Sequence, residues 1–301
     1  MTDMAESKTR KRILVLGASG MLGHMLVRVL APHHEVIGTT LSDYDNKSPL
    51  AQVLKRDFWL DRVDMRDWDA FELTVSNLNP EIVINCVGVI KQKMEPGNVL
   101  DAIYINSLVP HKIAHLCDLR RIKLIHFSTD CVFEGTLGLK RLSDTPNATD
   151  LYGTTKRLGE VTYGQSLTIR TGFVGRQLSG SEGLFEWLRE QRGRSVNGFK
   201  NAIYSGLTTM ALSRVVQDII EKHSDLAGLH QIASTPINKF DLINKLNSRL
   251  ALALSVESNT DFWCDRSLDG SEFTGLTDIA IPSWDEMLDE FASDQHFYCD
   301  I

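Results

Sequence analysis

The first half of the sequence alternates short apolar segments with amphipathic ones, and this alternation constrains the fold more than any other feature. The apolar segments RILVLG, EVIGTT, EIVINCVGV, RIKLIHFS and LTIRTGFVG are rich in β-branched residues, as buried strands are. Between them lie segments such as MLGHMLVRVLA, whose apolar residues recur at helical spacing. Apolar strands separated by helices predict a parallel sheet covered on both faces. Because crossovers between parallel strands are right-handed, we expect an α/β fold with a doubly wound sheet.

The composition disfavours several classes of function. A formal net charge of -7 argues against nucleic acid and anionic membranes as partners, because both attract clustered Lys and Arg. The chain has no stretch of about eighteen apolar residues that could span a membrane, and its polar first residues lack a signal-peptide pattern. Five scattered cysteines without a CxxC pair are typical of a reduced cytoplasmic protein. They predict neither a disulfide framework nor a metal site, and we expect no metal.

The first apolar segment runs into GASGMLG, in which three glycines are spaced GxxGxxG before a predicted helix. Glycines at such a turn let the backbone approach a pyrophosphate, which then lies at the positive end of the helix dipole. The position of the turn, on the first strand of a βαβ series, favours a dinucleotide site over an ordinary tight turn. The candidate residues are Gly17, Ser19, Gly20, Met21, Leu22 and Gly23.

After Arg170 the alternation becomes irregular. Helical patterns continue in GLFEWLREQRG, GLTTMALSRVVQDIIEKH and NKFDLINKLNSRLALAL, but the segment from Val256 onward has no clear pattern. We therefore expect two units and a disordered tail at 1–11. Residues 12–170 and about 207–233 would form the NAD(P)-binding Rossmann domain. Residues about 171–206 and 234–301 would form a smaller, partly interleaved substrate lobe.

The end of the second predicted strand bears on the choice of dinucleotide. An acidic residue there would hold the ribose 2′-hydroxyl of NADH, but this strand ends in Thr39 and Thr40. Their hydroxyls could donate to a 2′-phosphate, so we expect NADP(H) to be preferred, with NAD(H) as the alternative. Asp64, followed by Met65, lies where it could accept a hydrogen bond from the adenine amino group, although a turn residue is an equal interpretation.

Tyr152 and Lys156 form a YxxxK motif in the segment YGTTKRLGE. At a spacing of four residues on a helix, the two side chains lie on one face. An ammonium beside a phenol favours the phenolate, so we expect Lys156 to lower the pKa of Tyr152 and make it a usable acid. A surface pair is the alternative, but the dinucleotide turn and the polar strand end in HFSTDC favour a site.

Together, the glycine triplet, the STD sequence, YxxxK and LTIRTGFVG resemble the extended short-chain dehydrogenase/reductases. The nearest branch is that of the dTDP-4-dehydrorhamnose reductases, and the resemblance covers roughly residues 12 to 235. It implies a catalytic triad of Thr129, Tyr152 and Lys156, with Tyr152 protonating a sugar carbonyl oxygen as hydride arrives from the nicotinamide. It also implies cofactor contacts from Asn106, Tyr152 and Lys156, and from the strand-end residues Cys86, Val87 and Gly88.

The resemblance implies an oxidoreductase that reduces a nucleotide-linked 4-keto-6-deoxyhexose for surface-polysaccharide synthesis. Its substrate carries two phosphate charges, which suit Lys or Arg. Lys91, Asp130 and Arg176 are therefore candidate substrate contacts. The stretch NAIYSGLTT lacks the arginine that extended members commonly have there, so the usual phosphate arginine is in doubt.

Three alternatives stay open at this point. Nucleotide-sugar dehydratases carry Thr-Asp-Glu at the strand end, and Cys131 replaces that glutamate here, which disfavours dehydration. In the related GDP-fucose synthases a cysteine at the matching place is an acid/base, so Cys131 could serve a bifunctional epimerase/reductase, although a buried cysteine is usually a small hydrophobe. A non-catalytic NADP-binding regulatory subunit, like the methionine adenosyltransferase β subunit, is the third. A homodimer is also left open.

Overall fold

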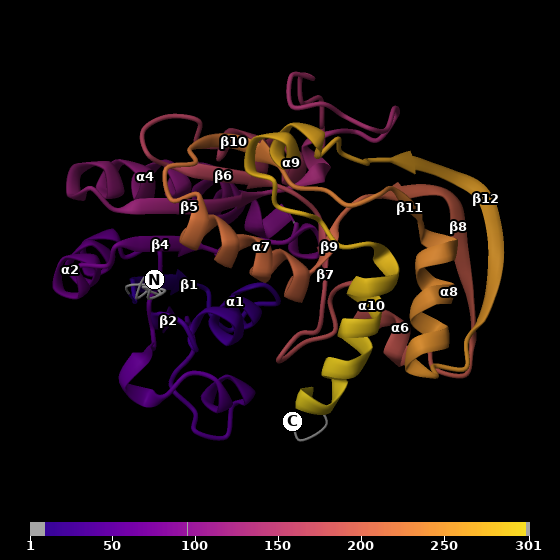
Figure 1. The fold of residues 1–301 in the computed structure, drawn as a ribbon, viewed down its shortest axis with the longest axis horizontal. Helices are drawn as coiled ribbons and strands as arrows, with labels where there is room; N and C mark the ends of the chain where they lie inside the picture. The colour runs from indigo at the N-terminus through magenta and orange to yellow at the C-terminus, as the bar shows by residue number, and fades with distance from the viewer. Residues whose placement is uncertain (1–9, 95, 299–301) are drawn as a thin grey trace, which may run out of the picture.

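The computed structural model describes residues 10–94 and 96–298, and its largest unit is a seven-stranded, all-parallel sheet (Figure 1). In sheet order its strands are β3 (Trp59–Leu60), β2 (Glu35–Thr39), β1 (Arg12–Leu16), β4 (Ile82–Asn85), β5 (Lys123–Ser128), β6 (Leu167–Arg170) and β10 (Gly228–Gln231). The strand order reverses between β1 and β4, where doubly wound sheets form their ligand crevice. The predicted fold class is confirmed. Most of the predicted tail, residues 1–9, lies outside the described residues.

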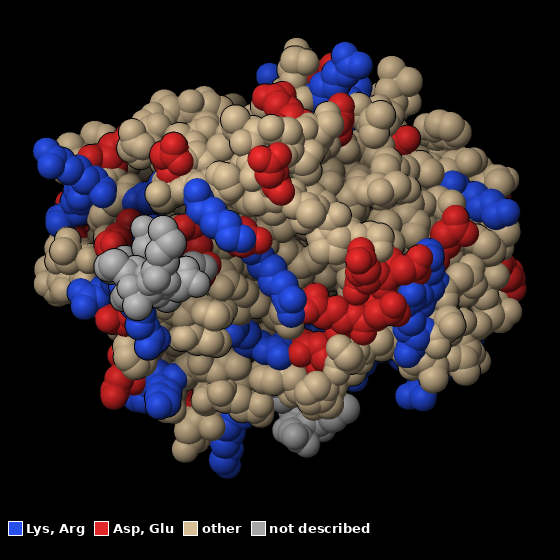
Figure 2. Space-filling model, viewed as in Figure 1, with Lys and Arg blue, Asp and Glu red and all other residues tan. Residues whose placement is uncertain are grey.

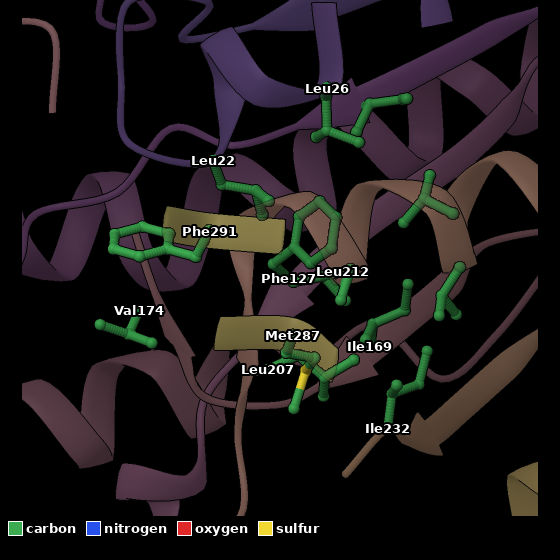
Figure 3. Close-up of a cluster of buried hydrophobic side chains, with 14 of the residues drawn as sticks. Leu22, Leu26, Phe127, Ile169, Val174, Leu207, Leu212, Ile232, Met287 and Phe291 are labelled. Atoms are coloured by element: carbon green, nitrogen blue, oxygen red, sulfur yellow. The ribbon is translucent and has the colours of Figure 1, made fainter. Parts of the chain in front are cut away.

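Helices cover both faces of this sheet, as the apolar strands require. On one face pack α1 (Gly23–Leu30), α7 (Thr209–Lys222) and α10 (Trp284–Ser293); on the other pack α2 (Trp68–Leu78), α3 (Val99–Ile103), the π-helical η5 (Tyr104–Leu108) and α4 (Val109–Arg120). Alternate residues of β1 serve the two cores: Ile13 and Val15 face the first, and Leu14 and Leu16 the second. Figure 3 shows Leu22, Phe127, Leu212 and Phe291 converging in the first core.

A smaller three-stranded sheet forms the second lobe, which lies beside the carboxyl ends of the large sheet (Figure 1). Its strand order is β11 (Ile237–Asn238), β8 (Ser195–Tyr204) and β12 (Ser255–Asp265), and α8 (Lys239–Leu250) packs against it. The two-stranded ladder of β7 (Phe173–Val174) and β9 (Leu207–Thr208) lies between the two sheets in the chain path. The remaining helices are α5 (Leu151–Leu158), α6 (Leu184–Glu190) and α9 (Ser271–Thr277).

The sequence patterns missed the two long strands of the second lobe. In β8 and β12 most side chains are exposed or half-buried, so neither strand carries the apolar run that marks the large sheet. The patterns also missed the short helices η1 (Pro49–Gln52), η2 (Arg56–Phe58), η3 (Lys91–Lys93), η4 (Pro96–Asn98), η6 (Asp130–Val132) and η7 (Asp294–Tyr298). Asp67 caps α2: its carboxylate accepts the N–H of Ala70 at 3.2 Å.

The C-terminal helix α10 ties the two lobes together. Its acidic side chains gather on one face, flanked by basic side chains over α7 and α8 (Figure 2). Asp285 accepts from both Lys245 and Arg249 of α8 at 2.7 Å, and Glu290 pairs with Arg214 of α7. Within residues 10–94 and 96–298, no helix is long and apolar enough to cross a membrane.

Candidate active site

A cavity of about 710 Å³ opens at the carboxyl ends of the central strands of the large sheet and extends under the second lobe. It brings together most of the residues that the sequence singled out. These are Ser19, Gly20, Met21, Leu22, Gly23, Cys86, Val87, Gly88, Lys91, Thr129, Asp130, Cys131, Tyr152 and Lys156. Polar residues at this edge of a parallel sheet are typical of a ligand site.

The glycine turn has the shape that a dinucleotide requires. Gly17 has φ +75, a conformation that L-residues rarely adopt, and Gly20 donates its N–H to the Gly17 carbonyl at 3.0 Å. A Cβ on Gly23 would lie 2.1 Å from the Gly17 oxygen, so only glycine lets α1 start this close to the strand. The turn from Ser19 to Gly23, which leads into α1, lines the cavity, and the residues present fit a bound pyrophosphate.

Asn106 fixes the strand-end segment that lines the cavity beside the glycine turn. It lies in the π-helical η5, an irregularity that frees its side chain from the helix surface. Its Oδ1 accepts the N–H of Val89 at 2.8 Å, and its Nδ2 donates to the Val89 carbonyl at 2.9 Å. Asn106 thus acts on the backbone that follows Gly88, whereas the resemblance implied a contact with the cofactor.

Thr129, Tyr152 and Lys156 all line the cavity, although they come from two elements. Thr129 follows β5, where its hydroxyl caps η6 by accepting the N–H of Cys131 at 3.1 Å and donates to Asp130 at 3.1 Å. Tyr152 and Lys156 lie one turn apart on α5, whose first turn is capped by Asp150. The Lys156 ammonium donates to the Phe127 carbonyl at 2.7 Å, which fixes α5 against the end of β5.

Burial controls the protonation of this pair. It raises the pKa of Tyr152 above its ordinary value, and nearby Cys131 adds to the effect while Thr129 opposes it. This is opposite to the lowered tyrosine pKa that the YxxxK motif led us to expect. Burial also lowers the pKa of Lys156 to about 8, against the opposing charge of Glu160. Near neutral pH the tyrosine therefore keeps its proton and the lysine is mostly charged.

Glu160, which the sequence analysis did not single out, anchors the helix of the site. Its carboxylate forms a bidentate pair with Arg170 of β6, at 2.9 and 2.8 Å, and accepts from Ser128 at 2.7 Å. Arg170 is 1% exposed and also donates to Gln231 of β10 at 3.1 Å. Pairs this deeply buried need such geometry to offset the cost of removing charges from water. The network joins α5 to three parallel strands.

Cys131 lies in the cavity beside a cation from the second lobe. Its thiol is 3.8 Å from a guanidinium nitrogen of Arg266, which follows β12. Burial, followed by the charge of Asp130, nevertheless raises the pKa of the Cys131 thiol to about 12. The side chain is therefore a thiol near neutral pH, able to donate a proton but weak as a base.

The second lobe supplies cavity residues that the sequence patterns did not reveal. Lys239 and Arg266 both line the cavity. Burial lowers the pKa of Lys239, and the neighbouring Asp130 and Cys131 oppose this shift. Phe262, half exposed on β12, lines it too. No local motif marks these residues, because they lie more than a hundred positions from the glycine turn and only the fold brings them there.

Five candidates have other contacts. Arg176 does not line the cavity: its guanidinium donates to Glu186 at 2.9 Å and stacks 4.4 Å from the ring of Tyr298. Asp64 pairs with Arg66 at 2.7 Å. The hydroxyl of Thr40 accepts from Trp59 and donates to the Ser42 carbonyl, and that of buried Thr39 accepts from Gly17. Because the polar groups of Arg176 and Thr40 are already bonded within the protein, we propose no ligand contact for either residue. Met65 is buried in the core between the large sheet and the helices α2 and α4.

Residues 11–250 match the model of the family described as RmlD substrate binding domain. Among curated relatives, a probable low-salt glycan biosynthesis reductase of Haloferax volcanii is 33% identical over 48% of this chain and 46% of its own length. A dTDP-4-dehydrorhamnose reductase of Streptomyces griseus is 32% identical over 50% of this chain and 44% of its own. The chain thus spans about half the length of the curated relatives it matches.

Solved structures resemble the chain over nearly its whole length. A dTDP-4-dehydrorhamnose reductase of Bacillus anthracis in complex with NADP superposes with a TM-score of 0.75 at 20% identity. The superposition covers 95% of this chain and 99% of that one. At this identity the likeness establishes the fold, second lobe included.

Proposed function

The chain belongs to the RmlD substrate binding domain family, and from this membership and the site geometry we propose that it is an NAD(P)H-dependent reductase of a nucleotide-linked 4-keto-6-deoxyhexose. One observation carries the proposal: Thr129, Tyr152 and Lys156 line the same cavity as the glycine turn. A cofactor site, a proton donor and a carbonyl-binding hydroxyl in one cavity are what carbonyl reduction needs. The names of the reductases reported above support the same reaction class.

A reduced nicotinamide dinucleotide, held through its pyrophosphate at the glycine turn, would supply hydride to the carbonyl carbon of the sugar. The chain's own residues handle the charge that develops on the carbonyl oxygen. Tyr152, kept protonated by burial, donates its phenolic proton to that oxygen. The Thr129 hydroxyl binds the same oxygen, and the Lys156 ammonium stabilises the phenolate that Tyr152 leaves behind.

The second lobe offers the contacts for the rest of the substrate. Lys239 and Arg266 provide two positive charges in the cavity, as a diphosphate requires. They take the part for which the sequence suggested Arg176. Lys91, which also lines the cavity and pairs with Asp150 at 3.5 Å, is a further cation. Phe262 is half exposed at the edge of the cavity, where its ring can stack on a base.

We propose NADP(H) as the preferred cofactor, on the support of an arginine that the sequence analysis did not consider. The Val63 N–H donates to the Thr40 carbonyl at 2.9 Å, so Arg62 lies beside the end of β2. An arginine at this point can accommodate a 2′-phosphate. Arg62 is largely exposed and pairs with Asp43, whose carboxylate can accept a ribose hydroxyl, which leaves NAD(H) as the second choice.

The test is NADPH oxidation by the purified protein with dTDP-, UDP- and GDP-4-keto-6-deoxyhexoses. Tyr152→Phe removes the proton donor only, so we expect turnover on one nucleotide series to fall about 10²- to 10⁴-fold while NADPH binding is kept. Turnover that survives in Tyr152→Phe would contradict the role of Tyr152. Tight NADPH binding without turnover on any sugar would favour the regulatory-subunit alternative.

The epimerase/reductase is the second candidate, because Cys131 lines the cavity next to Arg266. A thiol there could deliver a proton to a sugar carbon. Deuterium uptake from solvent at sugar carbons that is lost in Cys131→Ala, with reduction retained, would establish it. Reduction without deuterium uptake in the unmodified protein would leave the simple reductase.

We also propose that the protein forms a homodimer through the surface of α3, η5 and α5. This surface carries a group of exposed apolar side chains on adjacent elements, the most exposed being Leu100 at 81% and Leu158 at 59%. The others are Val99, Ile103 and Leu108. Such groupings on a folded surface usually mark an interface, and a surface that pairs with itself joins two copies about a two-fold axis.

A further inference from the structure

The C-terminal segment η7 (Asp294–Tyr298) lies across α1, and one of its side chains is bonded to the glycine turn through a histidine. His24, on α1, is fully buried. Its Nδ1 lies 2.8 Å from the Gly20 carbonyl oxygen and its Nε2 lies 2.8 Å from the Tyr298 hydroxyl. Because a carbonyl only accepts, Nδ1 carries the proton and Nε2 accepts from Tyr298. A continuous chain of hydrogen bonds therefore joins Tyr298 to the turn that faces the cofactor.

A second set of contacts holds η7 firmly on α1. Arg28 forms a bidentate pair with Asp294, with both nitrogen–oxygen distances at 2.7 Å. Its guanidinium also stacks 3.8 Å from the centre of the Phe297 ring. Both members of the ion pair are mostly buried. This geometry fixes η7 to the helix that begins at the glycine turn.

The same segment holds the loop that borders the other side of the cavity. Arg176 stacks on Tyr298 at 4.4 Å and donates to the side-chain oxygen of Gln295 at 2.7 Å. Arg176 also donates to Glu186 of α6 at 2.9 Å, and the Glu186 carboxylate accepts the N–H of Gln177 at 3.0 Å. Arg176 and Glu186 thus fix both ends of the segment 177–183 to η7.

The segment 177–183 faces the cavity and meets the glycine turn directly. Gln177, Ser179, Glu182 and Gly183 line the cavity. A Cβ on Gly183 would lie 3.0 Å from the terminal carbon of Met21, so the segment and the turn already touch. A ligand that orders one of these two loops therefore acts on the other, both directly and through η7.

We propose that Tyr298 is a positioning residue that couples cofactor binding at the glycine turn to ordering of the segment 177–183 around the nucleotide sugar. The inference rests on the proposed function, since it takes the two ligands from there. Tyr298 touches both loops through partners that are themselves buried and bonded, so each loop has one preferred position when the other is in place. Coupling of this kind is reciprocal: NADPH tightens nucleotide binding by the factor by which the nucleotide tightens NADPH binding.

The experiment measures the dissociation constant of NADPH by fluorescence, alone and with saturating dTDP, UDP or GDP, whichever binds. We expect the nucleoside diphosphate to tighten NADPH binding about fivefold or more in the unmodified full-length protein. In Tyr298→Phe, which removes only the hydroxyl, the ratio should fall below about twofold. His24→Asn keeps a donor near the Gly20 carbonyl but cannot reach Tyr298, so it should lose the coupling to the same extent.

The control is Arg249→Gln, which breaks the exposed pairs of α8 with Asp285 and Asp289 of α10 without touching η7. It should keep the coupling of the unmodified protein. Native coupling in both folded variants, Tyr298→Phe and His24→Asn, would overturn the proposal, and so would two independent binding events in the unmodified protein. If the unmodified protein binds no NADPH, the proposed function fails and this inference fails with it.

Discussion

Burial shifts the pKa values of Tyr152 and Lys156, which share one face of α5, in opposite directions. It raises the pKa of Tyr152 and lowers that of Lys156 to about 8, so both neutral forms are favoured. A protonated tyrosine suits the donor in reduction, and the lysine is useful only while it is charged. The YxxxK spacing predicted that Tyr152 and Lys156 lie together at the site. Their protonation states, however, depend on their burial, which the spacing does not reveal.

The first prediction at this scale is a pH limit set by Lys156. Its ammonium loses the proton through about pH 8, whereas an exposed lysine would keep it to about pH 10.4. We therefore expect kcat/KM for reduction to fall about tenfold per pH unit above this point. The measurement is the pH–rate profile between about pH 6 and 10.

Glu160→Gln provides the matched test of that assignment. The Glu160 carboxylate raises the pKa of Lys156, so its removal should move the fall in rate to lower pH. Circular dichroism checks that the variant folds, since Arg170 loses its buried partner. A profile that stays flat to high pH in the unmodified protein, or a limb unmoved by Glu160→Gln, would assign the limit to another group.

The second prediction concerns the cofactor. Arg62 and Asp43 lie at the end of β2 and pair with each other, so each limits what the other can bind. Arg62→Ala should weaken NADPH about tenfold relative to NADH. Asp43→Asn, which frees Arg62 and removes a repelling charge, should shift the ratio toward NADPH. Comparing the NADPH and NADH affinities within each variant controls for general damage to the cofactor site. If this ratio is unchanged in both variants, Arg62 and Asp43 do not select the cofactor.

The helices of this fold differ in how clearly the local sequence marks them. The α5 helix starts at an Asp150 cap, α2 at Asp67 and α10 at a capping box of Ser283 and Glu286, all readable as sequence signals. The π-helical η5 is different, because no local pattern announces it. It interrupts α3 and α4 where Asn106 reaches Val89, so a tertiary hydrogen bond accompanies the irregularity.

The prediction at this scale comes from α1, where burial lowers the pKa of His24 to about 4 from an ordinary 6.5. Below pH 6.5 the unfolded chain binds more protons than the folded one, so stability is full above this pH and is lost as the pH falls toward 4. The gap corresponds to on the order of 3 kcal/mol. Urea titrations from pH 7 to 4 should show this loss, and His24→Asn should flatten it.

Two other buried histidines also contribute to the loss of stability in acid. Burial also lowers the pKa of His34 and of His126, so some acid sensitivity should remain in His24→Asn. An acid slope identical in the variant and the unmodified protein would mean that His24 keeps its proton on folding. In that case both ring nitrogens would donate, and Nε2 would donate to the Tyr298 hydroxyl instead of accepting from it.

At the scale of the whole molecule, the two lobes meet around one cavity and α10 holds them in place through pairs with both α7 and α8. The surface of α3, η5 and α5 faces outward from this arrangement with its apolar side chains exposed. Because α5 carries Tyr152 and Lys156, an interface there would also stiffen the site. The assembly and the chemistry would then depend on the same helix.

The prediction at this scale is that Leu100→Lys or Leu158→Lys turns a dimer into a monomer. Each change places a charge in the proposed interface without touching either core, so the fold should be unaffected. Leu276→Lys, at an equally exposed leucine of α9, is the control. Sedimentation equilibrium separates the outcomes, and a monomeric unmodified protein, or a dimer that survives both changes, would reject the surface.

The sequence by itself determined the parallel sheet, the glycine turn and the helix that carries Tyr152 and Lys156. These follow from local causes: continuous apolar strands need helices on both faces, Gly17 and Gly23 meet sterically at one turn, and Tyr152 and Lys156 share one helical face. Only the tertiary structure decided which cations reach the cavity. Arg176 looked available from its place after a strand, but it is paired with Glu186, while Lys239 and Arg266 arrive from a lobe whose half-exposed strands have no apolar signature. The physical reason is that pairing and burial depend on contacts between residues far apart in the chain.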